Sequence, residues 1–253
     1  MSGYGAPQLS LPKFTPAVKA ILIVCGAMYV IELVVINWIG LLAMIEELAL
    51  FPEKVTGWPP HIWQLFTYLW LHHPNDPSHL LFNMLGLWLV GALLEQRWGT
   101  RPFLKFYLLT GLFAGLTVVA VGEMLGSNTP VLGASGAVDG LMIAFGILYP
   151  NLPIYFFGVL PLKGKHFVLI LVGLNVLYAA ARLDGVSVSA HFGGMAAGAL
   201  LVTGLWRPSR LRLKLFGPPK ARPPRRPAHL KVVPDDDEDD GAPGGNGKGR
   251  MLH

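Results

Sequence analysis

Two residues far apart in this sequence could together attack a carbonyl group: Ser135 and His191. Ser135 stands in the stretch G-A-S-G, residues 133–136, where an apolar segment begins, and His191 stands at the start of another apolar segment. A serine hydroxyl is a weak nucleophile until a base takes its proton, and histidine is the usual base because it ionises near neutral pH. The pair therefore predicts acyl-transfer chemistry at Ser135.

Acyl transfer also requires hydrogen-bond donors that stabilise the negatively charged oxygen formed in the transition state. The backbone amide of Ser135, at an expected helix start, is one candidate. His79 and Asn83 are four residues apart, so they share one face of a helix and offer two side-chain donors. These three groups are the candidate oxyanion hole.

The composition places most of the chain in a lipid bilayer. Hydrophobic residues make up 53% of the sequence and charged residues only 14%, whereas soluble domains contain about 25% charged residues. Cys25 is the only cysteine, which excludes a disulfide framework and a cysteine-based metal cluster. The basic residues mostly flank apolar segments, as expected of a membrane protein and not of a nucleic-acid-binding domain.

Six apolar segments have the character of membrane-spanning helices, so the expected fold class is all-α and polytopic. The segments are 17–41, 79–95, 102–121, 135–149, 166–182 and 188–206. The first has no cleavage site after it and is expected to be retained, not removed as a signal peptide. The sequence thus divides into an N-terminal segment (1–16), a membrane domain (17–206) and a tail (207–253). The tail is basic, then acidic, then Gly-rich, and is expected to be disordered.

The distribution of positive charge predicts which side of the membrane each segment end occupies. All but two of the 20 Lys and Arg residues, Lys54 and Arg182, fall on the side of the two termini, so that side is expected to be cytoplasmic. Even-numbered segments then begin near the outer face. His79, Ser135 and His191 each lie at or near such a beginning, so topology predicts that they converge.

Glycines predict close packing of the two segments that carry Ser135 and His191. Gly136 and Gly140 form one G-x-x-x-G pattern, and Gly194 and Gly198 form another. Small residues at this spacing let helix backbones approach closely. A helix over 135–149 is also shorter than the roughly 20 residues that a crossing needs, which predicts that Ser135 lies below the outer surface in a water-filled pocket.

Four motifs resemble those of the rhomboid intramembrane serine proteases. G-A-S-G at 133–136 matches the family's G-x-S-G, and A-H-F-G-G-M-A-A-G at 190–198 is similar to its A-H-x-G-G-x-x-x-G. H-L-L-F-N at 79–83 resembles the family's H-x-x-x-N, and E-Q-R-W-G at 95–99 resembles the end of its second span. The resemblance covers roughly residues 58 to 206, with the motifs in the family's order, and implies a six-helix rhomboid-like bundle.

The resemblance also implies roles for these residues. Ser135 would be the nucleophile and His191 the base, in a dyad that requires no acid. His79, Asn83 and the Ser135 amide would form the oxyanion hole. Gly133, in the serine motif, is expected to allow close helix packing, like the glycines of the two G-x-x-x-G patterns.

The implied activity is that of a serine endopeptidase that cuts single-pass membrane proteins in or near their spans. The fifth span and the outer loop before His191 would admit the substrate. The resemblance implies no metal and no organic cofactor. The Lys/Arg-flanked segments and the Pro/Gly-rich tail would suit a bacterial inner membrane.

The chain departs from the family pattern at two positions. The family's first outer loop carries Trp-Arg, whereas Trp63 is followed by Gln64 here, which affects the stability or placement of that loop. Asp139 occupies a position where members commonly carry an aromatic or small residue. It lies one helical turn from Ser135, and an ionisable group at membrane depth is a functional candidate. Asp139 could orient His191 as a third catalytic-site member, or simply hydrogen-bond within a wet cavity.

Other interpretations of the same residues remain open at this point. The chain could be a non-catalytic rhomboid relative that binds membrane clients, although such relatives lack the serine or the histidine. It could be a transporter whose Ser135, Asp139 and Asn83 line a pathway, but transport requires polar groups through both halves of the membrane, and the inner ends of the even-numbered segments are apolar. Ser135 alone would be read as a small residue for helix packing.

A few further polar residues have simpler interpretations. His72, His73, His79 and Asp76 could be read as a metal site, but loop histidines are more often solvated. Glu32 in the first segment is expected to face the helix bundle or an interface without taking part in chemistry.

Overall fold

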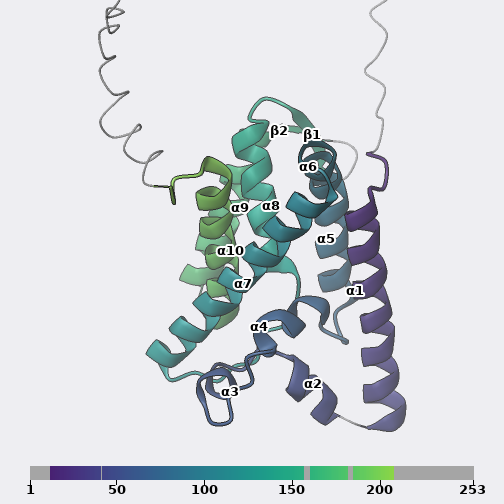
Figure 1. Ribbon diagram of the computed structural model, residues 1–253, viewed down its shortest axis with the longest axis vertical. Coiled ribbons are helices and arrows are strands. Elements are labelled where there is room, and N and C mark those ends of the chain that lie inside the picture. Colours follow the sequence, from purple (N-terminus) through teal and green to yellow (C-terminus); the bar gives the residue numbers. More distant parts are fainter. Residues whose placement is uncertain (1–11, 41, 157–159, 182–184, 208–253) are drawn as a thin grey trace, which may run out of the picture. The chain divides into compact units, whose positions relative to one another are not determined.

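The computed structural model describes residues 12–40, 42–156, 160–181 and 185–207, and most of these residues are helical (Figure 1). Three helical stretches are long and apolar enough to cross a membrane: Pro16–Ile39, Pro77–Trp98 and Thr100–Leu125. Three shorter apolar helices cover Ser135–Leu148, Gly164–Ala180 and Ser187–Thr203. Helices thus coincide with all six expected segments. Most of the N-terminal segment and nearly all of the expected tail lie outside the described residues.

The long stretches are built from several helical elements. The first is α1 (Pro16–Val34), which continues as the π-helical turn η1 (Val35–Ile39). The second comprises α5 (Pro77–Gly86), the π-helical turn η3 (Leu87–Gly91) and α6 (Ala92–Trp98). The remaining large helices are α7 (Thr100–Leu125), α8 (Ser135–Leu148), α9 (Gly164–Ala180) and α10 (Gly185–Thr203).

Smaller elements fill two of the connections between the expected segments. The connection between η1 and α5 contains α2 (Leu42–Leu48), α3 (Pro52–Thr56), α4 (Gln64–Thr67) and the 3₁₀ turn η2 (Tyr68–Trp70). The connection between α8 and α9 contains β1 (Pro153–Phe156) and β2 (Leu160–Lys163), paired antiparallel. The all-α expectation was therefore incomplete, because proline interrupts helix and the β-branched and aromatic residues of P-I-Y-F favour a strand.

Glu95, near the end of the second long stretch, is hydrogen-bonded to the beginnings of α1 and α7. Its buried carboxylate accepts hydrogen bonds from the backbone N–H groups of Ala17 (2.9 Å) and Val18 (3.0 Å) and from the hydroxyls of Thr15 and Thr100. Free N–H groups at a helix start need such acceptors. This glutamate therefore fixes α1 against α6 and α7.

Glycines allow α8 and α10 to pack with their backbones almost in contact. A Cβ added at Gly136 would lie 2.9 Å from the carbonyl oxygen of Ala190, and one at Gly140 would lie 2.9 Å from that of Gly194. A Cβ at Gly194 or Gly198 would overlap the backbone of α8. Only hydrogen fits at these positions, so both G-x-x-x-G patterns lie at the contact between the two helices.

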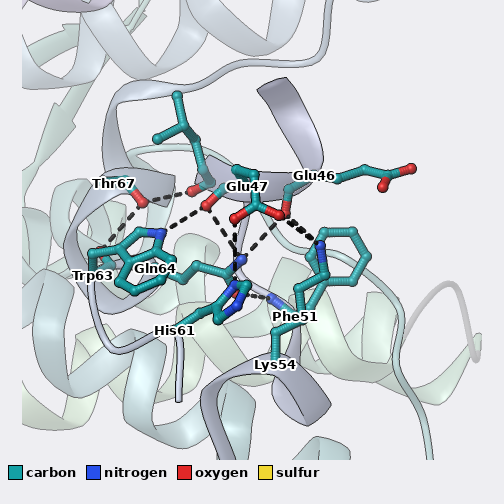
Figure 2. Close-up of polar contacts among 9 residues, drawn as sticks. Glu46, Glu47, Phe51, Lys54, His61, Trp63, Gln64 and Thr67 are labelled. Atoms are coloured by element: carbon teal, nitrogen blue, oxygen red, sulfur yellow. Dashed lines mark hydrogen bonds and ion pairs between the residues drawn. The ribbon is translucent and has the colours of Figure 1, made fainter. Parts of the chain in front are cut away.

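Gln64 anchors the first connection at the position where the family carries arginine (Figure 2). Its side chain is fully buried. Its amide oxygen accepts the Phe51 N–H at 3.0 Å, and its amide nitrogen lies 3.2 and 3.3 Å from the carbonyl oxygens of Glu46 and Glu47. The indole of Trp63 donates to the same Glu47 carbonyl at 2.9 Å. A neutral amide thus ties the end of α2 to the start of α3.

The backbone leading to Ser135 is held by this connection. Val131 and Leu50 exchange two backbone hydrogen bonds of 2.9 Å, and the Gly133 N–H donates to the Tyr68 carbonyl at 2.9 Å. Non-helical backbone at membrane depth must be buried and must find partners within the protein. Val131 and Gly133 are indeed buried, and the partners come from the loop between α2 and α5.

Candidate active site

His191 lies between Ser135 and Asp139. The Oγ atom of Ser135 is 3.5 Å from Nε2 of His191, and Nδ1 of His191 is 2.7 Å from Oδ2 of Asp139. Ser135 and Asp139 lie one turn apart on α8, and α10 supplies the imidazole across the glycine contact. The Ser135–His191 distance is at the long end for a hydrogen bond, as is common for catalytic groups without substrate.

The hydrogen bond to Asp139 determines which ring nitrogen of His191 carries a proton. An ionised carboxylate only accepts hydrogen bonds, so Nδ1 must be the protonated nitrogen. In the neutral ring Nε2 then carries a lone pair directed at Ser135. The side chain of Asp139 is 8% exposed and that of His191 29%, so the acid side of the pair is sheltered while the imidazole remains accessible.

His79 lies beside Gly133, two residues before Ser135. A Cβ added at Gly133 would stand 2.7 Å from Cε1 and 2.8 Å from Nε2 of His79. The other ring nitrogen, Nδ1, lies 3.4 Å from the backbone N–H of His73 and accepts from it. The proton of a neutral His79 is therefore on Nε2, the nitrogen beside the Ser135 loop.

Gly133 has a backbone conformation that L-residues rarely adopt. Its φ is +121°, and the His79 ring occupies the space that a side chain would fill. Glycine is thus required at position 133 for two reasons: the backbone conformation disfavours other residues, and the His79 ring leaves no room for a side chain.

The other two candidate oxyanion donors are the Ser135 N–H and the Asn83 side-chain amide. The Ser135 N–H belongs to the first turn of α8, whose amides lack partners within the helix and lie at its positive end. Asn83 is buried, and its Nδ2 donates to the His79 carbonyl at 2.8 Å. A carboxamide nitrogen carries two hydrogens, so one remains after this bond.

An apolar cavity of about 450 Å³ lies between the second long stretch and α9. Its lining includes Phe82, Leu85 and Leu89 on one side and Phe167, Ile170 and Leu171 on the other. Phe82 adjoins Asn83 in sequence. The cavity therefore borders the helix that carries two candidate oxyanion donors.

The loop histidines do not assemble a metal site. Among the residues with described positions, no three or more His, Cys, Asp or Glu side chains gather closely enough to hold a metal ion. The rings of His72 and His79 instead lie near each other, with centroids 5.3 Å apart. Asp76 caps α5 by accepting the Ser78 N–H at 3.1 Å.

Sequence reasoning missed the part that α1 plays near this site. The Glu32 carboxylate is fully buried and accepts the His72 N–H, and the Tyr29 hydroxyl donates to the Pro74 carbonyl. The available signal was an ionisable residue in a long apolar segment. Its backbone partner could not be read from residue types.

Comparison with known proteins agrees with the motifs. A family model described as the Rhomboid domain matches residues 59–208, a range that contains Ser135, Asp139 and His191. "Rhomboid protease GluP" of Bacillus subtilis is 31% identical over 146 residues, covering 58% of this chain and 26% of that protein. "Rhomboid protease GlpG" of Yersinia pestis is 28% identical over 127 residues, covering 50% and 41%.

Some relatives have names that state no activity. "RHOMBOID-like protein 12, mitochondrial" of Arabidopsis thaliana is 30% identical over 139 residues, covering 49% of this chain and 41% of that protein. The chain thus spans 26% to 41% of the length of these three relatives. The matched domain nevertheless covers more than half of the chain. The chain belongs to the rhomboid family and is an integral membrane protein.

Proposed function

We propose that this protein is an intramembrane serine endopeptidase with Ser135 as nucleophile and His191 as base. The observation that carries the proposal is the position of the His191 ring, 3.5 Å from Ser135 Oγ and 2.7 Å from Asp139 Oδ2. A serine chosen only for helix packing needs no imidazole beside it. Two relatives that are named as rhomboid proteases support the same reaction class.

The first half of the reaction forms an acyl-enzyme. Ser135 Oγ attacks the scissile carbonyl carbon while Nε2 of His191 takes the hydroxyl proton. The resulting oxyanion receives hydrogen bonds from Nε2–H of His79, the free Nδ2–H of Asn83 and the Ser135 N–H. His191 then returns the proton to the leaving amine as the C–N bond breaks.

The second half consumes one water molecule. Water attacks the acyl-enzyme carbonyl while Nε2 of His191 takes its proton, and the same donors stabilise the second oxyanion. Collapse breaks the bond to Ser135 Oγ, which recovers the proton from His191, and releases the carboxylic acid product. Each donor favours the transition state because it meets a charge that the substrate carbonyl lacks.

Asp139 extends the dyad as a positioning residue. By accepting a hydrogen bond from Nδ1–H of His191 it holds the tautomer in which Nε2 is basic, and it stabilises the imidazolium formed during attack. This is the role of aspartate in soluble serine protease triads. A neutral side chain at position 139 could not supply the second effect.

The proposed substrates are single-pass membrane proteins that enter from the lipid. The apolar cavity between the α5–η3 stretch and α9 would admit an apolar segment beside the catalytic groups. We propose that all six helical stretches cross the bilayer and that both termini are cytoplasmic, because nearly all Lys and Arg residues then lie inside. The Ser135–His191 dyad would lie in a separate, water-filled cavity that opens to the outer face.

We assign the protein to a bacterial inner membrane on the strength of its Lys/Arg-flanked spans and Pro/Gly-rich tail. Its relatives include mitochondrial proteins as well as bacterial ones, so similarity alone does not select the compartment.

Labelling with a fluorophosphonate probe tests the proposal at the nucleophile. The Ser135 oxygen would displace fluoride from phosphorus, so purified wild-type protein should be labelled at Ser135. The Ser135→Ala variant should not be labelled, and the His191→Asn variant should react far more slowly. A folded wild-type protein without labelling would overturn the proposal in favour of a non-catalytic relative that binds membrane clients.

A further inference from the structure

Two residues of α1 hold the loop that leads into the candidate oxyanion hole. The Tyr29 hydroxyl donates to the Pro74 carbonyl at 3.1 Å, and the two carboxylate oxygens of Glu32 lie 3.1 and 3.3 Å from the His72 N–H. Tyr29 and Glu32 are three residues apart and therefore share one face of the helix. Two bonds from one face fix the backbone of residues 72–74.

The burial of Glu32 is unusual for a purely structural helix residue. The carboxylate is 0% exposed in a stretch of 24 residues that is apolar enough to cross a membrane. An ionisable group in such a place is costly and needs a partner. A backbone N–H directed at both carboxylate oxygens supplies such a partner.

The next peptide group connects this loop to His79. The His73 N–H lies 3.4 Å from Nδ1 of His79. A donor at Nδ1 places the His79 proton on Nε2, the nitrogen beside Gly133 and the Ser135 loop. The buried His72 ring packs against the same imidazole, with 5.3 Å between centroids. A shift of residues 72–73 would therefore change both the tautomer and the position of the His79 ring.

We propose that Glu32 and Tyr29 are positioning residues that hold the loop 72–74 so that His79 presents its Nε2–H to the oxyanion. The inference rests on the proposed function, because it assigns His79 the donor role. It adds to the site a carboxylate and a phenol from α1, which lies outside the motifs that carry the family resemblance.

The first test compares four variants in liposomes with a single-span reporter substrate. Glu32→Leu removes the acceptor, Glu32→Gln keeps one oxygen in place, and Tyr29→Phe removes the second bond. The matched control is Asn37→Leu, because the Asn37 side chain is exposed and its amide donates to the Leu33 carbonyl of the same helical stretch (2.9 Å).

Glu32→Leu should lower kcat by about 10- to 100-fold with little change in KM, since small displacements of a catalytic donor have effects of this size. Glu32→Gln should restore much of that loss, Tyr29→Phe should lower kcat less than Glu32→Leu does, and Asn37→Leu should match the wild type. Thermal unfolding separates positioning from folding, because a purely structural contact would lower Tm without a selective fall in kcat.

A double-mutant cycle with His79→Ala tests whether the effect passes through His79. If it does, Glu32→Leu should cause no further loss when His79 is already absent. Should Glu32→Leu fail to fold, Tyr29→Phe takes its place in the same cycle. Equal losses in the two backgrounds, or wild-type kcat in folded Glu32→Leu, would overturn the inference alone. A wild-type protein that cleaves no reporter would instead overturn the proposed function and, with it, the donor role of His79.

Discussion

Asp139 and Ser135 contact opposite nitrogens of one imidazole. Asp139 Oδ2 is 2.7 Å from Nδ1 of His191, and Ser135 Oγ is 3.5 Å from Nε2 of the same ring. Both residues come from α8, one turn apart, so the orientation of the imidazole is set by a single helix. The shorter of the two contacts is the one that the family's dyad does not require.

Replacing Asp139 should therefore impair catalysis more than stability. Asp139→Asn presents an amide that can donate to Nδ1 and thereby favour the wrong tautomer, a change that costs about 10⁴-fold in a soluble serine protease. We expect kcat to fall at least 10-fold with KM little changed, and fluorophosphonate labelling to slow in parallel. Near-normal turnover of folded Asp139→Asn would show that the carboxylate merely fills a wet cavity.

A methyl group at Gly133 should displace His79. The added Cβ would lie 2.7–2.8 Å from the ring, and φ is +121°. Gly126→Ala is the matched control, because Gly126 also has a positive φ (+60°) but nothing within 4 Å of the new Cβ. Backbone strain of roughly 1–2 kcal/mol should lower the unfolding free energy of both variants, while kcat should fall only in Gly133→Ala. Equal kcat values would argue against His79 as an oxyanion donor.

Loss of the Gln64 amide should loosen the first connection. Gln64→Leu leaves the Phe51 N–H and the Glu46 carbonyl without their buried partner, at about 1–3 kcal/mol for such unsatisfied groups. We expect a lower Tm in detergent, with Gln96→Leu as the exposed glutamine control. An unchanged Tm in Gln64→Leu would mean that the loop is held mainly by Trp63 and the apolar contacts.

Burial of His72 should make the stability of the protein pH-dependent. Desolvation, aided by the nearby His79, lowers the pKa of His72 from 6.5 to about 4. The unfolded chain then binds a proton between these values while the folded protein does not, so this contribution to stability is complete above pH 6.5 and is lost as the pH falls toward 4. From pH 7.5 to 5 the loss should be roughly 2 kcal/mol.

Denaturant titrations at several pH values can isolate this effect. Because other groups also titrate in this range, the informative quantity is the difference between the wild type and His72→Gln. The variant should lose less stability on acidification. Parallel pH profiles for the two proteins would contradict the assignment to His72.

The sequence predicted much of this arrangement because topology constrains where segment ends lie. Ser135, His191 and His79 all stand at or near the beginnings of even-numbered segments, and the structure places the three near one another. The prediction required only charge bias and hydropathy. The family membership suggested by the motifs is confirmed by the domain match.

Other features could not be predicted because they depend on backbone groups that the sequence does not distinguish. Glu32 was expected to face the bundle or an interface, but nothing in its identity pointed to the His72 N–H. The hydrogen bond from the Asn83 side-chain amide to the His79 carbonyl likewise arises from local backbone geometry. So does the pairing of β1 with β2. The Asp139–His191 contact was partly predictable. The sequence spacing placed Asp139 on the same helix face as Ser135, but it did not show which group the carboxylate contacts.

Cleavage of membrane proteins by Ser135 is best measured with purified protein in liposomes and reporter substrates. The reporters would be single-span proteins with small residues near the outer end of the span, incubated with wild type or with Ser135→Ala and followed by mass spectrometry of the products. We expect one defined cut in or near the span with the wild type and none with Ser135→Ala. Intact reporters with both proteins, or identical cleavage by both, would contradict it.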